Sequence, residues 1–102
     1  MGAYGRKRPQ MTLAVSFYDE LSSEGMARAR EVFPRHSAYA DEFAMSGDLL
    51  MIGTFADPVA DGSMGIFRSR EAAERFVAND PFIVEGVVVR WRILDWNGEA
   101  PE

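Results

Sequence analysis

The chain has 102 residues, a formal net charge of −5, 47% hydrophobic and 26% charged residues, one histidine and no cysteine. This length and composition indicate one globular domain, and the missing cysteines exclude a disulfide framework, thiolate chemistry and a cysteine-based metal site. A single histidine also excludes a multi-histidine metal site within one chain. No apolar run approaches the ~18 residues of a membrane span. We therefore expect no metal, no cofactor and no membrane partner.

The charged residues are distributed unevenly along the chain. Residues 1–10 hold three of the eleven basic residues, so sixteen acidic residues face only eight basic ones in the remainder. A nucleic-acid-binding surface requires a basic patch, and nucleic acid is therefore not an expected partner. We expect residues 1–10 to be a flexible tail, because patterned apolar residues begin only at Met11. No long apolar stretch follows the basic residues, which argues against a signal peptide and favours a cytoplasmic location.

The first half of the chain predicts a strand followed by helix. Residues 11–18 alternate between apolar and mixed side chains, as a strand with two different faces does. Helical patterning then extends over residues 24–46. Pro34 is expected to break or kink it after a short first helix that ends near Val32. Gly47 has the residue type that commonly follows the last turn of a helix.

The second half predicts two strands, a helix and a final strand. An apolar run within residues 48–55 predicts a buried strand, and a loop follows at 56–62. Residues 63–68 alternate and predict a third strand. Residues 69–79 form an amphipathic pattern with a capping serine at its start, which predicts a helix. The last strand is expected over residues 85–96.

The order β-α-β-β-α-β predicts an α+β ferredoxin-like sandwich, in which two helices cover one face of an antiparallel sheet. The single domain is expected to span residues 11–97, with a C-terminal tail at 98–102. One sheet face combines apolar, polar and charged residues. We expect this mixed face to be the open one, formed by Thr12, Ala14, Ser16, Tyr18, Val88, Arg90, Arg92 and Leu94. Such a face favours a symmetric homodimer in which the two open faces meet.

His36 and Asp80 are the candidate catalytic residues. His36 lies on an apolar helix face shared with Ala40 and Phe43, and Asp80 follows a predicted helix and precedes Pro81. Each residue also has a structural interpretation, as a histidine bonded to a carbonyl and as a turn-forming aspartate. Taken together they suggest a pair. If Asp80 accepts a hydrogen bond from one ring nitrogen, it fixes the tautomer and leaves the other nitrogen for proton transfer.

Other polar residues are candidates for substrate binding. Arg35 and Arg90 are suited to hold an anionic group by charge-assisted hydrogen bonds. They are equally suited to pair with the many carboxylates of this chain. Ser16 is a candidate for substrate contact, and no surrounding motif marks it or Ser37 as a nucleophile. The glycines at 62 and 65 lack the spacing of a phosphate-binding loop.

Several segments occur in an order and at a spacing found in a known family. They are Pro34-Arg-His36, Gly47-Asp-Leu-Leu50 with Gly53, Ser69-Arg-Glu-Ala-Ala73, Asn79-Asp-Pro-Phe82, and Gly86 with Asp95-Trp96. This ordered set covers about residues 11–97 and resembles the YciI-like (YCII-related) proteins. No single motif is decisive, but the ordered set is fairly specific.

The resemblance implies a ferredoxin-like fold of the dimeric α+β barrel type, with a site centred on His36 and Asp80. Some members of that family are dehydrochlorinases that act on chlorinated hydroxyquinols, and most have no assigned reaction. This chain departs from the family pattern at two positions. Phe33 stands where a basic residue often precedes the proline, and Ser37 stands where leucine often follows the histidine. The departures imply a different substrate or a site that has decayed.

Three hypotheses for function follow. The first is a small-molecule enzyme of the lyase or isomerase type, in which His36 moves a proton and Asp80 orients it. The alternative is a non-catalytic ligand-binding or accessory module, because the sequence shows no nucleophile motif, metal set or phosphate loop. The third is a domain that serves only for dimerisation. A histidine that lines a cavity favours the first two hypotheses, and one enclosed by side chains favours the third.

Overall fold

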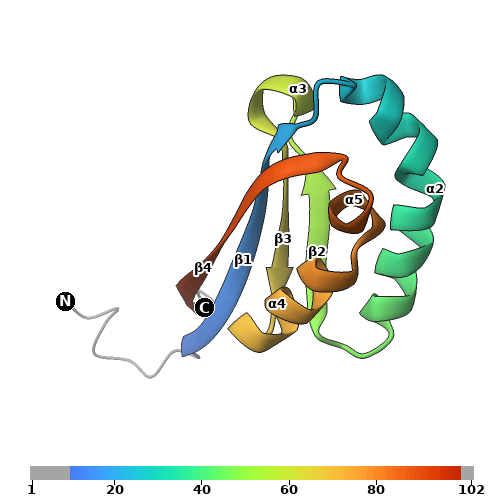
Figure 1. Ribbon diagram of the computed structural model, residues 1–102. Coiled ribbons are helices and arrows are strands. Elements are labelled where there is room, and N and C mark those ends of the chain that lie inside the picture. Colours follow the sequence, from blue (N-terminus) through green and yellow to red (C-terminus); the bar gives the residue numbers. More distant parts are fainter. Residues whose placement is uncertain (1–9, 100–102) are drawn as a thin grey trace.

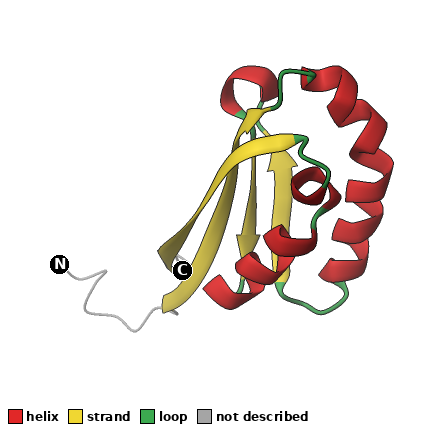
Figure 2. Cartoon of the chain, viewed as in Figure 1, coloured by secondary structure: helices red, strands yellow, loops and turns green. Residues whose placement is uncertain are grey.

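The computed structural model describes residues 10–99, which form one antiparallel sheet with helices against one of its faces (Figure 1). The sheet has the strand order β2-β3-β1-β4. The elements in chain order are β1 Gln10–Leu21, α2 Gly25–Ala44, β2 Leu49–Thr54, α3 Pro58–Asp61, β3 Ser63–Phe67, α4 Arg70–Asn79, α5 Pro81–Val84 and β4 Val88–Glu99. The predicted α+β ferredoxin-like fold is confirmed, with the short helices α3 and α5 as additions (Figure 2).

The first strand begins earlier, and the last strand ends later, than the sequence pattern predicts. Gln10 pairs with Glu99 and Met11 with Gly98, so residues that fall within the predicted tails belong to β1 and β4. The rest of the two predicted tails, residues 1–9 and 100–102, lies outside the described residues. Within residues 10–99, no helix is both long enough and apolar enough to cross a membrane.

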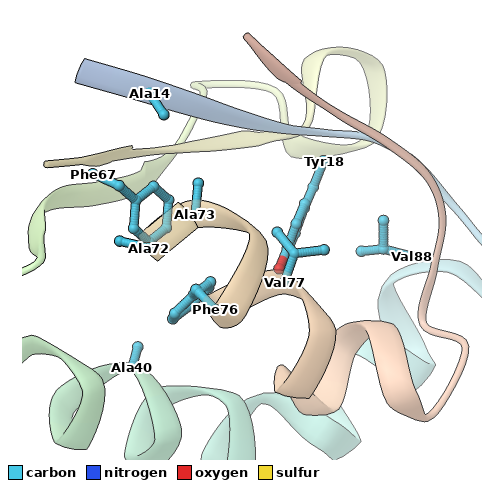
Figure 3. Close-up of a cluster of buried hydrophobic side chains, with 9 residues drawn as sticks. All are labelled: Ala14, Tyr18, Ala40, Phe67, Ala72, Ala73, Phe76, Val77 and Val88. Carbon is cyan, nitrogen blue, oxygen red and sulfur yellow. The ribbon is translucent and has the colours of Figure 1, made fainter. Parts of the chain in front are cut away.

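The core lies between the sheet and α4. Ser69 caps α4, because its hydroxyl accepts a hydrogen bond from the Ala72 N–H (3.1 Å). The buried face of α4 presents Ala72 and Ala73 to the central strand β1, and these small side chains allow a close approach. The aromatic rings of Phe67 and Phe76 fill the adjacent space, 5.2 Å apart between centroids (Figure 3). The core is therefore continuous from β3 across α4.

The two faces of β1 are the reverse of those expected from the sequence. Ala14 and Tyr18, assigned to the open face, belong to the core, and so does Val88 of β4; Tyr18 reaches from β1 toward the helices (Figure 3). The side chains on the uncovered face are Leu13, Val15 and Phe17. Alternation shows which residues share a face but not which face is covered. Here the close approach of α4 requires a small residue of β1 beneath it, such as Ala14. The larger residues of β1 lie on the uncovered face, where side chains of β3 and β4 flank them.

The break expected at Pro34 is absent, because α2 runs continuously from Gly25 to Ala44. A proline inside a helix removes one backbone hydrogen bond, to the carbonyl four residues earlier. Here that carbonyl belongs to Arg30, and both Arg30 and Pro34 are exposed. Water can therefore hydrate the freed carbonyl, and the helix continues.

Two further predictions about the strands are wrong. The strand β2 was expected to be buried, but its apolar residues Leu50, Met51 and Ile52 are all exposed, because β2 is an edge strand paired only with β3. The last strand begins at Val88 rather than at residue 85, because α5 and a turn occupy the preceding residues. Gly86 has a φ of 70° in this turn, a left-handed conformation that glycine adopts without strain.

The close packing of α4 on the sheet can be tested with one substitution on each side of the helix. Ala73→Leu places extra volume in the core, and we expect it to lower the free energy of unfolding by about 1–3 kcal/mol. Ala78→Leu is the matched control on the exposed side of α4, with an expected change below ~0.5 kcal/mol. Urea unfolding followed by circular dichroism measures both, and equal stabilities would contradict the close packing.

Candidate functional site

Asp80 lies at the junction of two helices. The helix α4 ends at Asn79, and Pro81 favours the extended conformation of Asp80, which has φ −66° and ψ 126°. The Asp80 carboxylate caps α5 by accepting a hydrogen bond from the Phe82 N–H at 3.0 Å. The residue is fully buried. The turn-forming role considered for Asp80 is therefore real, but it uses only part of the carboxylate.

The remaining capacity of the Asp80 carboxylate is taken by two other elements. The Tyr18 hydroxyl of β1 donates to Oδ2 at 2.6 Å. The Nδ1 atom of His36 on α2 lies 2.8 Å from Oδ1 and 3.0 Å from Oδ2. An ionised carboxylate only accepts hydrogen bonds, so Nδ1 carries the proton and a neutral His36 has its lone pair on Nε2.

The Tyr18 phenol is held in its neutral form. The pKa of Tyr18 is raised well above its usual value. Burial is the largest cause, followed by the negative charge of Asp80 and the hydrogen bond to Asp80. Tyr18 therefore remains a hydrogen-bond donor to Asp80 throughout the physiological pH range.

The ring of His36 is fixed by stacking as well as by hydrogen bonding. The Phe82 ring lies parallel to it, with centroids 4.0 Å apart and planes 3° apart. The ring of Phe33 packs against the same imidazole, with 5.9 Å between the ring centroids. The side chain of His36 is 12% exposed. No hydrogen bond from any residue in the range 10–99 reaches Nε2, so this nitrogen is available to a bound molecule.

A cavity of about 470 Å³ opens next to His36, between α2 and the sheet. Its walls are mostly apolar, and its volume is typical of small-molecule sites. The residues that line it include Met26, Ala29, Arg30, Phe33, His36, Ser37, Ala40 and Asp41 of α2, Ser16 and Tyr18 of β1, Ile52 and Gly53 of β2, Met64 and Gly65 of β3, and Phe82 of α5. His36 thus lines a cavity, which the third hypothesis does not expect.

The structure brings some predicted site residues together and separates others. His36 and Asp80 are in contact, and Ser16 lines the same cavity. Arg35 donates two hydrogen bonds to Glu85, at 2.9 and 2.6 Å, and does not line the cavity. These bonds raise the pKa of Arg35 and lower the pKa of Glu85. Arg90 lies 3.5 Å from a carboxylate oxygen on β1 and is also outside the cavity lining.

Sequence reasoning missed the roles of Tyr18 and Phe82. Tyr18 was assigned to the open face, and Phe82 was named only as the last residue of the motif Asn79-Asp-Pro-Phe82, yet both contact the His36–Asp80 pair. A weak signal was present for Phe82, because it lies two residues after Asp80 and therefore close to it. For Tyr18 no local signal existed, because its partner is 62 residues away in the sequence. Among residues 10–99, no three His, Cys, Asp or Glu side chains gather as metal ligands.

The fold and the site define a ferredoxin-like α+β domain with a histidine–aspartate pair at the wall of a cavity. A family model, the YCII-related domain, matches residues 11–97, which covers every helix and all but the outer ends of β1 and β4. The chain belongs to the YCII-related family. No curated protein and no solved structure matches it.

The buried phenol of Tyr18 should make the fold sensitive to alkaline pH. Its pKa is raised on folding, so its contribution to stability is complete below the unfolded value of ~10 and is lost as the pH rises above that value. The Tyr18→Phe variant removes this ionisation. We expect its urea midpoint to fall less than that of the wild type between about pH 9 and pH 11.

The same variant should be less stable near pH 8 by about 1–3 kcal/mol, because buried Asp80 loses a donor. Urea unfolding at a series of pH values measures both effects. Parallel declines in the two proteins at alkaline pH would show that the phenol is not held neutral by folding.

Proposed function

We propose that this protein is a small-molecule enzyme that catalyses proton transfer of the lyase or isomerase type. The observation that carries the proposal is the His36–Asp80 pair, in which Nδ1 is held by a buried carboxylate and Nε2 has no hydrogen-bond partner in residues 10–99. A histidine oriented in this way is a suitable general base. The cavity beside it provides space for a small substrate.

In the proposed reaction, Nε2 of His36 removes a proton from a carbon atom of the substrate. Asp80 stays ionised and stabilises the imidazolium that forms, through the hydrogen bond from Nδ1–H. In a lyase, the electrons of the broken C–H bond form a double bond while a leaving group departs with its bonding pair. In an isomerase, His36 returns the proton to a different atom of the substrate.

The surroundings of the pair support this role, because they limit reorganisation during the reaction. Tyr18 and the Phe82 N–H each donate to Asp80, so the carboxylate is held by donors besides His36. The parallel Phe82 ring restricts rotation of the imidazole. A base held in one orientation loses little entropy when a substrate binds.

The positions at which this chain departs from the family pattern bear on its substrate. Phe33 and Ser37 both line the cavity, one on each side of His36 in the sequence. Phe33 adds an aromatic surface and Ser37 adds a hydroxyl beside the proposed base. We therefore propose a substrate different from that of relatives with a basic residue and a leucine at these positions.

A solvent-exchange assay tests proton transfer without knowledge of the complete reaction. A base that removes a carbon-bound proton exchanges it with deuterium in D₂O, and ¹H NMR follows the loss of the substrate signal. We expect wild-type protein to exchange at least one member of a panel of 2-oxo acids and 3-halo acids. His36→Gln should lower the exchange rate by about 10²–10⁴-fold, because a positioned base is removed.

Asp80→Asn should lower the same rate, because the amide no longer stabilises the imidazolium. The control is Glu74→Gln, which removes an exposed carboxylate on α4, outside the cavity lining. If a panel member binds but wild type and His36→Gln exchange it equally, the ligand-binding alternative replaces the enzyme.

We also propose that two copies form a symmetric homodimer through the uncovered sheet face. That face presents a set of apolar side chains, with Met51 69%, Leu94 46% and Trp96 49% exposed. Next to them, Val15, Phe17 and Ile66 line a shallow hollow. A contiguous apolar surface of this kind is typical of an interface between copies. The face is more apolar than the mixed one expected from the sequence, so the proposal gains support from the corrected orientation of β1.

Light scattering coupled to size-exclusion chromatography measures the assembly. We expect a mass of two chains for the wild type and one chain for Leu94→Asp, because a carboxylate in an apolar interface is costly. Val84→Asp is the matched control, since Val84 is 67% exposed on α5, away from the sheet face. Unchanged assembly in Leu94→Asp would place the interface elsewhere.

A further inference from the structure

Arg30 is an exception among the arginines of this protein. Eight arginines lie within residues 10–99, and seven of them have a carboxylate or carbonyl oxygen within bonding distance. Arg30 has neither an ion pair nor a hydrogen bond in this range. Acidic residues outnumber basic ones, sixteen to eleven, so a carboxylate without a partner is expected from the numbers. An arginine without a partner is not expected from these numbers.

The unpaired guanidinium belongs to a residue that lines the cavity. Arg30, Phe33 and His36 share one stripe of α2 at helical spacing, and all three are cavity residues. Arg30 and His36 are six residues apart, or ~9 Å along the helix axis. One small molecule can therefore contact the side chains of both residues.

The other charges in the cavity favour a singly charged ligand. Three carboxylates also line it, those of Asp19, Glu20 and Asp41. Asp19 and Glu20 each pair with an arginine of β4. Asp41 is eleven residues from Arg30, ~16 Å further along the helix. Arg30 is thus the one arginine among the described residues that line this otherwise acidic cavity. A single arginine suits a monoanion such as a carboxylate better than a phosphate dianion.

Ser16 provides a second unsatisfied group in the same cavity. The residue is 4% exposed, and its hydroxyl has no hydrogen-bond partner within residues 10–99. Gly65 lies directly opposite in the β1–β3 pair and also lines the cavity. A Cβ atom at position 65 would lie 3.2 Å from Oγ of Ser16 and 3.0 Å from the Phe67 ring. Glycine therefore leaves the hydroxyl accessible from the cavity, and a buried hydroxyl without a partner is costly.

We infer, on the basis of the proposed function of this cavity, that its substrate is a small carboxylic acid with an apolar body and a second polar group. Arg30 binds the carboxylate, and the hydroxyl of Ser16 bonds a hydroxyl or carbonyl group at the floor of the cavity. Phe33 and Phe82 contact the apolar body. This arrangement places a carbon atom between the two polar groups next to Nε2 of His36. Arg30 and Ser16 bind and orient the substrate, and His36 transfers the proton.

Matched probes test the charge at the Arg30 end. 4-Hydroxybenzoate and 4-hydroxybenzamide differ mainly in charge, and ¹H–¹⁵N NMR titration of the full chain gives their dissociation constants. We expect the wild type to bind the benzoate about tenfold more tightly than the benzamide, as is typical of a hydrogen bond to a charged group. Arg30→Gln should bind the two probes equally. Arg70→Gln, which removes the same charge from α4 outside the cavity, should keep the preference.

A second pair of probes tests Ser16. Wild type should bind 4-hydroxybenzoate several-fold more tightly than benzoate, and Ser16→Ala should remove this difference while keeping the preference for the anion. The inference is overturned if wild type binds the anion no more tightly than the amide. It is overturned as well if wild type binds neither probe at millimolar concentration. It is also overturned if Arg30→Gln behaves like Arg70→Gln.

These outcomes are distinguishable from failure of the proposed function. The probes have only aromatic C–H bonds and undergo no proton removal, so the titration reports binding alone. A lost preference leaves the exchange assay unaffected, and a failed exchange assay leaves the preference intact.

Discussion

The buried carboxylate of Asp80 is the constraint on which the rest of the structure depends. A charge removed from water must be satisfied by donors, and the donors of Asp80 come from β1, α2 and α5. Three elements distant in the sequence must therefore meet at one point. This requirement also determines the orientation of β1, because Tyr18 reaches Asp80 only from the face that the helices cover. The same bonds that organise the fold hold Nδ1 of His36, which lines the cavity, and leave Nε2 without a hydrogen-bond partner in residues 10–99.

The cavity follows from the way α2 is held. This helix is fixed at Asp80 and packs on α5 and, through Tyr39 and Phe43, on α4. Small residues lie beneath it where the sheet approaches, among them Ser16, Gly53 and Gly65. Space therefore remains between α2 and the strands β2 and β3. The exposure of Ile52 on β2 has the same origin, because this residue lines the cavity.

Local signals were sufficient for the element order, the cap of α4 and the end of α4 before Pro81, because each depends on neighbours in the sequence. The His36–Asp80 pair was predicted only with help from the family resemblance, since its members are 44 residues apart. Three features were predicted wrongly for a common physical reason. The covered face of β1, the continuity of α2 through Pro34 and the exposure of β2 all depend on which side of an element meets water. Tyr18 contacts Asp80 because its side chain lies on the covered face of β1. The alternation of residues along β1 does not show which face is covered.

Asp80 and Phe82 are two residues apart, and together they supply the carboxylate and the flat ring that hold His36. The remaining cavity residues lie on other segments, mainly one stripe of α2 and the strands β1, β2 and β3. Most of the cavity wall is thus encoded apart from the tetrapeptide 79–82, although Phe82 belongs to both. Mutations can reshape the cavity without disturbing the tetrapeptide 79–82. This division leaves the shape of the cavity open to change in evolution, and it gives protein engineers a defined set of positions to randomise while the orienting segment stays constant.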